Sequence, residues 1–198
     1  MLALLMVGGL SMAVIVVAPR LAQWGWLVRA EAALATHLVR WHRPRTIALF
    51  ADLSAPGSST WVALGAALAA AAFVAGGQWP GALAVAIAPA LAGPLGSWLK
   101  RRTRRDRPDD PLGLYFGSSM PSNHTLMATA LYGTLAVELL ARLGPGDDAL
   151  RAVVLAAALL VIVTVGASRV LLRVHHPSDV VAAWLLGAAI VAAVALRP

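Results

Sequence analysis

The sequence has no cysteine and carries little charge. The absence of cysteine among 198 residues excludes disulfides, thiolate nucleophiles and Cys-based zinc sites. Only 13% of the residues are charged, whereas 60% are hydrophobic, and the mean hydropathy is +0.77. Because soluble domains are typically about 45–50% apolar, this composition excludes a soluble globule and a disordered chain. It indicates one integral membrane domain over residues 1–198.

Lysine is almost as scarce as cysteine. Of the 16 basic residues, 15 are arginine, and Lys100 is the single lysine. The formal net charge of +7 favours binding of anionic lipid headgroups or of a phosphorylated substrate in a membrane protein. Nucleic acid is not expected as a partner, because few aromatic residues lie among the basic ones and the chain is tethered to a bilayer. The oligomeric state cannot be read from the sequence.

Long apolar runs predict the architecture, because a membrane-spanning helix needs about 20 apolar residues. We predict an all-α fold, a six-transmembrane helix bundle with an interfacial amphipathic helix at 23–42, where apolar residues recur at helical spacing. A linker helix packed on the bundle fits that segment equally well. Ser54 to Ser59 is interpreted as a turn. The predicted spans are 2–18, 60–76, 81–98, 122–140, 152–167 and 177–196.

Six spans would place three polar loops, 19–59, 99–121 and 168–176, on one face of the membrane. The second of these loops has six cations within the eight residues from Lys100 to Arg107. A stop-transfer or headgroup-binding cluster would explain that run taken alone. The face as a whole carries most of the basic residues and most of the other polar chemistry of the chain.

Two further polar segments coincide with predicted helix starts. Pro121 fits the first turn of a helix, where Ser122 adds a hydroxyl and His124 a titratable group, so this end can bind an anion. Near the last predicted span, Asp179 can reach back to His175, fix its tautomer and leave the other ring nitrogen as a nucleophile or base. Taken separately, each segment is also explained by a helix cap with histidines at the membrane interface.

Together, the three segments resemble the three-part signature of the type 2 phosphatidic acid phosphatase (PAP2) superfamily. The matching pattern is Lys100-x6-Arg107-Pro108, then Pro121-Ser122-Asn123-His124, then Ser168-Arg169-x5-His175-x3-Asp179. The resemblance implies a metal-independent lipid phosphatase without cofactors that acts through a phosphohistidine. It assigns catalytic roles to His175, His124 and Asp179, and phosphate binding to Lys100, Arg107, Ser122, Asn123 and Arg169.

One position departs from the usual pattern of that superfamily. Asn123 stands where glycine is most frequent in the second motif. Glycine lets a backbone approach phosphate closely, whereas asparagine keeps the backbone N–H and adds a side-chain amide. We therefore expect an active site with an altered headgroup preference. His176 does not match the spacing of the nucleophile and is expected to be structural.

The substrate predicted from this resemblance is a lipid phosphate in the bilayer. Undecaprenyl diphosphate and phosphatidylglycerol phosphate are the leading candidates, and phosphatidate and a lipid A phosphate are alternatives. A non-catalytic lipid-binding protein would not need two histidines and Asp179 at this spacing. A transporter would be expected to place its polar groups near the membrane midplane rather than at helix ends.

The sequence gives conflicting indications of orientation in the cell membrane. The excess of arginine on the motif face places that face in the cytoplasm by the positive-inside rule. Many bacterial relatives resemble an arrangement with the site facing outward, and phosphate-binding cations distort the count. We predict an extracytoplasmic site, testable by labelling a cysteine introduced at Ser119.

Overall fold

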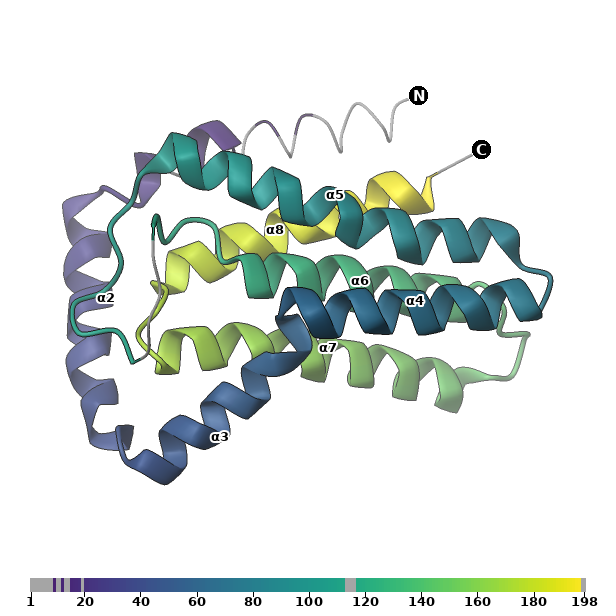
Figure 1. Cartoon of the computed structure of the whole chain (residues 1–198), viewed down its shortest axis with the longest axis horizontal. Helices are drawn as coiled ribbons and strands as arrows, with labels where there is room; N and C mark the ends of the chain where they lie inside the picture. Colours follow the sequence, from purple (N-terminus) through teal and green to yellow (C-terminus); the bar gives the residue numbers. More distant parts are fainter. Residues whose placement is uncertain (1–8, 10–11, 13–14, 19, 113–116, 197–198) are drawn as a thin grey trace.

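The computed structural model describes residues 9, 12, 15–18, 20–112 and 117–196 (Figure 1). Within these ranges every regular element is a helix, which confirms the all-α class. The first predicted span, 2–18, lies largely outside the described residues. The helices are α2 (Gly25–Leu38), α3 (Pro44–Ser54), α4 (Ser59–Ala75), α5 (Trp79–Thr103), α6 (Asn123–Leu140), α7 (Asp148–Leu171) and α8 (Pro177–Ala195), with single 3-10 turns η1 (Val39–Trp41) and η2 (Ala55–Gly57).

The five later predicted spans coincide with α4 to α8, with boundaries that differ by a few residues. Three helices, α5, α7 and α8, are long and apolar enough to cross a membrane. The α3 and α4 segments pass the same test together as one span with a 44° bend. The described residues therefore carry three or four candidate spans, and the count of six stays a prediction.

Helix α3 was not predicted, because no long apolar run covers 44–54 and the sequence indicated only a turn at Ser54 to Ser59. Pro44 occupies the first turn of α3, where its missing N–H leaves no hydrogen bond unmade. The turn predicted at Ser54 to Ser59 is confirmed as the single 3-10 turn η2, which ends at Gly57. Helix α4 then starts at the Ser58 cap, whose hydroxyl accepts the N–H of Trp61.

Helix α6 is the centre of the bundle and contacts α4, α5, α7 and α8 (Figure 1). Its buried Leu126 and Ala130 pack with small side chains of α5 and α8. Gly187 of α8 lies so close to Thr129 that an added Cβ would come within 2.5 Å of it. Such small residues allow close helix packing, as expected where lipid supplies no hydrophobic drive between helices.

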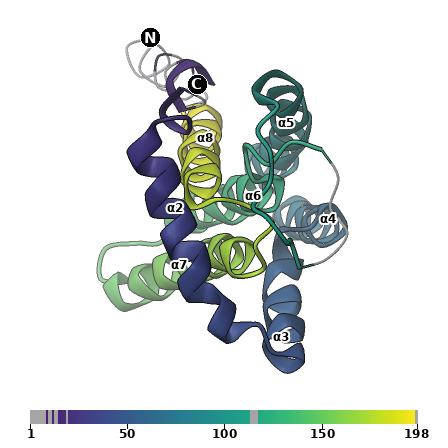
Figure 2. The same cartoon turned by 90° about the vertical axis from the view of Figure 1, so that its left-hand side faces the viewer.

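Helix α2 crosses the end of the bundle at which α5 and α7 end and α8 begins, and in Figure 2 it passes in front of α7 and α8 (Figures 1 and 2). Its Trp26 is exposed, whereas its Glu31 is buried. The carboxylate therefore faces the protein and not the outer surface. The interfacial placement predicted for this helix stays a prediction.

Candidate active site

The candidate site lies at the bundle end that α2 covers. It combines the C-terminal ends of α5 and α7 with the N-terminal ends of α6 and α8. The hydrogen bond from the Ser122 N–H to the Asp179 carbonyl, 3.2 Å, joins the starts of α6 and α8 directly. Residues from all three sequence motifs thus meet at one end of the bundle.

His175 and Asp179 form the buried centre of this site. The exposed fractions of His175 and Asp179 are 4% and 0%. Nδ1 of His175 lies 3.6 Å from Oδ2 of Asp179, longer than a hydrogen bond, and this nitrogen has no other hydrogen-bond partner among the described residues. Catalytic hydrogen bonds are often long before substrate binds. The arrangement turns Nδ1 toward the carboxylate, which leaves Nε2 for chemistry.

Burial lowers the pKa of His175 to about 4, because a desolvated imidazole resists protonation. Asp179 acts in the opposite direction and favours the charged ring, while Lys100 and Arg169 add to the lowering. At neutral pH the ring is therefore uncharged. A neutral imidazole has the lone pair that a nucleophile needs.

His124 lies in the first turn of α6, within electrostatic reach of His175, Lys100 and Arg169. The turn η2 packs on its backbone: a Cβ added at Gly57 would lie 2.6 Å from the His124 carbonyl oxygen. Glycine is required there by this close approach. The α3–α4 junction thereby fixes the start of α6 and the place of the second histidine.

Ser122 is the N-cap of α6 and is fully buried. Its hydroxyl accepts a hydrogen bond of 3.0 Å from Thr125. The side chain of Asn123 packs against Gly96 of α5, and its Oδ1 has no hydrogen-bond partner among the residues described. The side-chain amide of Asn123 is therefore turned toward α5, and its backbone N–H lies in the first turn of the helix.

The three predicted phosphate-binding cations are held by protein oxygens. Lys100 Nζ donates to the carbonyls of Ser118 and Ser119 at 2.7 and 3.2 Å. Arg107 donates to the Val174 carbonyl, next to His175, at 2.6 Å. Arg169 is 1% exposed and donates to Ser54 Oγ of α3 at 3.1 Å. Each cation is thus fixed in position before a ligand arrives.

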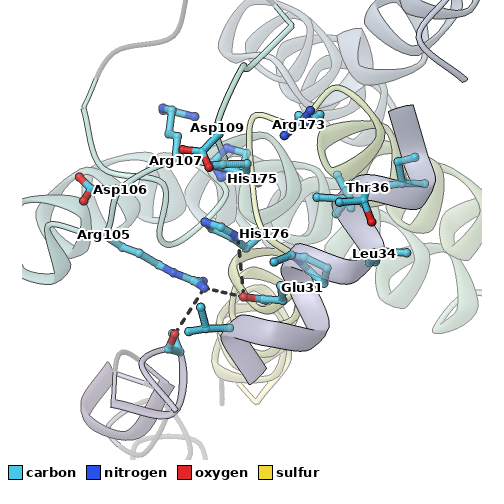
Figure 3. Close-up of a pocket in the computed structure, with 18 of the residues that line it drawn as sticks. Glu31, Leu34, Thr36, Arg105, Asp106, Arg107, Asp109, Arg173, His175 and His176 are labelled. Carbon is cyan, nitrogen blue, oxygen red and sulfur yellow. Dashed lines mark hydrogen bonds and ion pairs between the residues drawn. The ribbon is translucent and has the colours of Figure 1, made fainter. Parts of the chain in front are cut away.

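A cavity of about 650 Å³ opens between α2 and these loops (Figure 3). Of the predicted site residues, Arg107 and His175 line it. Arg107 also lines a second cavity, of about 850 Å³, together with Lys100. The remaining predicted residues lie outside both linings. His175 is thus a predicted catalytic group that lines the cavity beside α2.

Sequence reasoning missed two charged residues at the site, Glu31 and Arg105. Arg105 is one of the six cations between Lys100 and Arg107, and Glu31 lies in the helix predicted at 23–42, but the sequence analysis assigned neither residue a role. In the structure Arg105 donates to Asp179 Oδ1 at 2.6 Å and to Glu31 Oε2 at 2.7 Å. Nothing in the local sequence could reveal this, because Glu31 is 74 residues from Arg105.

His176 caps helix α8. Its backbone N–H donates to Asp179 Oδ2 at 2.8 Å, in a capping box. Burial lowers the pKa of His176, and the neighbouring charge of Arg105 adds to the effect. The described residues contain no cluster of three or more His, Cys, Asp or Glu side chains able to hold a metal ion.

Comparison with known protein families places this geometry in context. The family model of the PAP2 superfamily matches residues 34–197. The chain belongs to the PAP2 superfamily. It is a membrane enzyme, a phosphatase that hydrolyses phosphate esters of lipids.

The fold is also similar to a solved structure of this PAP2 superfamily. That structure is the crystal structure of a transmembrane PAP2-type phosphatidylglycerolphosphate phosphatase from Bacillus subtilis. The TM-score is 0.81 at 25% sequence identity, with 91% of this chain and 90% of that chain covered. Comparison with curated proteins gives no match.

Proposed function

We propose that this PAP2 enzyme removes phosphate from its lipid substrate through a phosphohistidine on His175. The observation that supports this most directly is the buried His175, turned by Nδ1 toward Asp179 and facing a cavity beside Arg107. No metal ion or cofactor takes part in the proposed reaction.

In the first step, Nε2 of His175 forms a bond to phosphorus as the bond from phosphorus to the lipid oxygen breaks. His124 donates a proton to that oxygen, and the dephosphorylated lipid leaves. The imidazole gains positive charge as the bond forms, and the carboxylate of Asp179 stabilises that charge. In the second step His124 takes a proton from a water molecule, whose oxygen forms a bond to phosphorus as the bond from phosphorus to Nε2 of His175 breaks. Inorganic phosphate is released, and His175 returns to the neutral state.

Cations and helix-start donors stabilise the charge on the transferring phosphoryl oxygens. Lys100, Arg107 and Arg169 supply positive charge, and Ser122 and the backbone N–H of Asn123 supply hydrogen bonds. Lys100 uses two of its three N–H donors on carbonyls, so the third can reach phosphate. Donors fixed in advance are worth about 2–4 kcal/mol each where charge develops in the transition state.

Phosphatidylglycerol phosphate is the first substrate we propose. The support is the similarity in fold to a phosphatidylglycerolphosphate phosphatase over nine-tenths of each chain. Undecaprenyl diphosphate is the second candidate, because a site at helix ends also suits a prenyl diphosphate whose tail stays in the bilayer. Phosphatidate and lipid A phosphates complete the panel to be tested.

The test is phosphate release by the purified protein from each lipid of this panel, with and without a chelator. We expect turnover that the chelator leaves unchanged and that His175→Ala abolishes. Turnover in His175→Ala would refute the nucleophile. A protein that binds these lipids without releasing phosphate, or that moves them across vesicles, would refute the proposed function.

A further inference from the structure

Asp179 of the proposed catalytic pair also belongs to a cluster of buried charge, whose other members, Arg105 and Glu31, have no part in the reaction described above. Its centre is Arg105, whose side chain is 14% exposed. The guanidinium lies between two carboxylates, those of Glu31 and Asp179, whose side chains are 4% and 0% exposed. Figure 3 shows Arg105 reaching across to Glu31 on α2, with His176 beside them.

Glu31 uses both of its oxygens in this cluster. Oε2 accepts from Arg105 at 2.7 Å, and Oε1 accepts the backbone N–H of Ser178 at 2.9 Å. Ser178 lies in the first turn of α8, where free N–H groups and the helix dipole favour a carboxylate. Glu31 therefore holds Arg105 and the start of α8 together, one residue before Asp179.

The net charge of this cluster determines how strongly Asp179 attracts a positively charged His175. Arg105 donates to Asp179 Oδ1 at 2.6 Å, while Oδ2 faces His175 at 3.6 Å. A lone guanidinium in this place would neutralise Asp179 and weaken its attraction for a positively charged His175. Glu31 supplies a second carboxylate to the same guanidinium. With His176 uncharged, the buried group keeps one surplus negative charge beside the nucleophile.

We infer that Glu31 of α2 is a positioning residue for the phosphatase reaction, which acts through Arg105 to keep Asp179 oriented and negatively charged toward His175. This inference rests on the roles proposed above for His175 and Asp179. It assigns to α2 a part in catalysis, although the described part of this helix makes no extensive backbone contact with the long helices of the bundle. The Glu31 carboxylate is its polar link to the site.

The test is a steady-state comparison of Glu31→Gln with the native enzyme on the lipid that the native enzyme hydrolyses best. Glutamine has nearly the same shape but no charge. We expect kcat to fall roughly 10–100-fold, the range typical when the outer hydrogen-bond partner of a metal-ligating residue is removed, because Glu31 likewise acts on the reacting group through other residues. KM should change less than about twofold, because Glu31 is not proposed to touch phosphate.

A double-mutant cycle separates positioning from a merely structural role. If Glu31 acts through Asp179, then Glu31→Gln should lower kcat in the native background but change it little in an Asp179→Asn background. Equal fold losses in the two backgrounds, or an unchanged kcat in the native background, would overturn the inference. Glu31→Asp, which keeps the charge on a shorter chain, should recover part of the lost rate.

Glu138→Gln is the matched control, because Glu138 is also a buried carboxylate paired with an arginine, Arg142 at 3.1 Å, but it lies at the far end of α6. It should keep the native kcat, and the melting temperature of each variant reports folding. If both glutamine variants lose kcat equally, the inference fails. Absence of phosphate release by the native protein would instead refute the proposed function.

Discussion

At the scale of single residues, burial gives His175 the properties of a nucleophile. An exposed histidine would be partly protonated near pH 6.5, whereas burial lowers the pKa of His175 to about 4. The ring is then uncharged at neutral pH. Asp179 limits the shift, and in the proposed reaction it stabilises the charge that the ring gains as the bond to phosphorus forms.

This low pKa can be measured by an NMR titration of the five histidines, with His175 assigned by its loss in His175→Ala. We expect His175 to protonate near pH 4. A midpoint near pH 6.5 would contradict the buried environment. Because the folded pKa lies below the unfolded one, the unfolded chain binds the proton first as the pH falls. The contribution of His175 to stability is therefore present above pH 6.5 and is lost between pH 6.5 and about 4.

The sequence named the motif residues that meet at this end of the bundle, and their roles stay predictions, but it did not indicate which other residues support them. His124, His175 and Asp179 could be found because each lies in a motif of fixed spacing near a helix start. Glu31 lies outside the motifs, Arg105 occupies an unspecified position of the first motif, and their pairing depends on how α2 crosses the bundle end. Long-range ion pairs of this kind follow from tertiary structure and not from local pattern.

At the scale of elements, the contact between α5 and α6 accounts for the unusual asparagine of the second motif. The side chain of Asn123 fills the space above Gly96, and a Cβ at Gly96 would overlap its side-chain oxygen. The extra side chain at Asn123 is thus accommodated by a glycine on the neighbouring helix. The expectation that its amide side chain adds a donor for phosphate is not supported by this orientation.

Gly96→Ala should therefore destabilise the protein by about 1–3 kcal/mol, the usual cost of overpacking, and should lower the melting temperature. Asn123→Gly in the same chain removes the overlapping side chain and should restore part of the loss. Gly93→Ala is the control on the same helix, because a Cβ there would meet only the end of Met127 at 3.9 Å. Equal losses in the two alanine variants, or no rescue by Asn123→Gly, would contradict this packing.

Helix prediction succeeded where long apolar runs dominate and failed where they do not. Helices α4 to α8 follow from hydropathy, and all of them except α7 have proline or serine at their starts. Helix α3 was missed because Thr46 and Asp52 interrupt a short run that looks like a loop. Its place becomes clear only in three dimensions, where it packs on α7 and brings Ser54 to Arg169.

At the scale of the whole molecule, the two ends of the bundle differ in chemistry. One end holds the candidate site, and the other holds the turns that join α4 to α5 and α6 to α7 (Figure 1). The side of the membrane on which the site lies stays a prediction. Ser119, first chosen for cysteine labelling, is 0% exposed and donates to the Asp106 carbonyl, so it is unsuitable.

Asp109→Cys and Asp148→Cys are the better pair for labelling by an impermeant reagent in intact cells. Both positions are exposed, and they lie at opposite ends of the bundle. With no native cysteine, each signal comes from one site. We expect labelling of Asp109→Cys and protection of Asp148→Cys until the cells are opened. The reverse pattern would place the site in the cytoplasm.

The central claim of this account is that His175 carries the phosphoryl group, and trapping that group tests it most directly. Native protein is mixed with phosphatidylglycerol phosphate labelled in its terminal phosphate, quenched in alkali within one turnover, and analysed by peptide mass spectrometry. We predict acid-labile phosphate on the peptide that contains His175, and none in His175→Ala. Phosphate on another residue, or release without any protein-bound phosphate, would contradict the account.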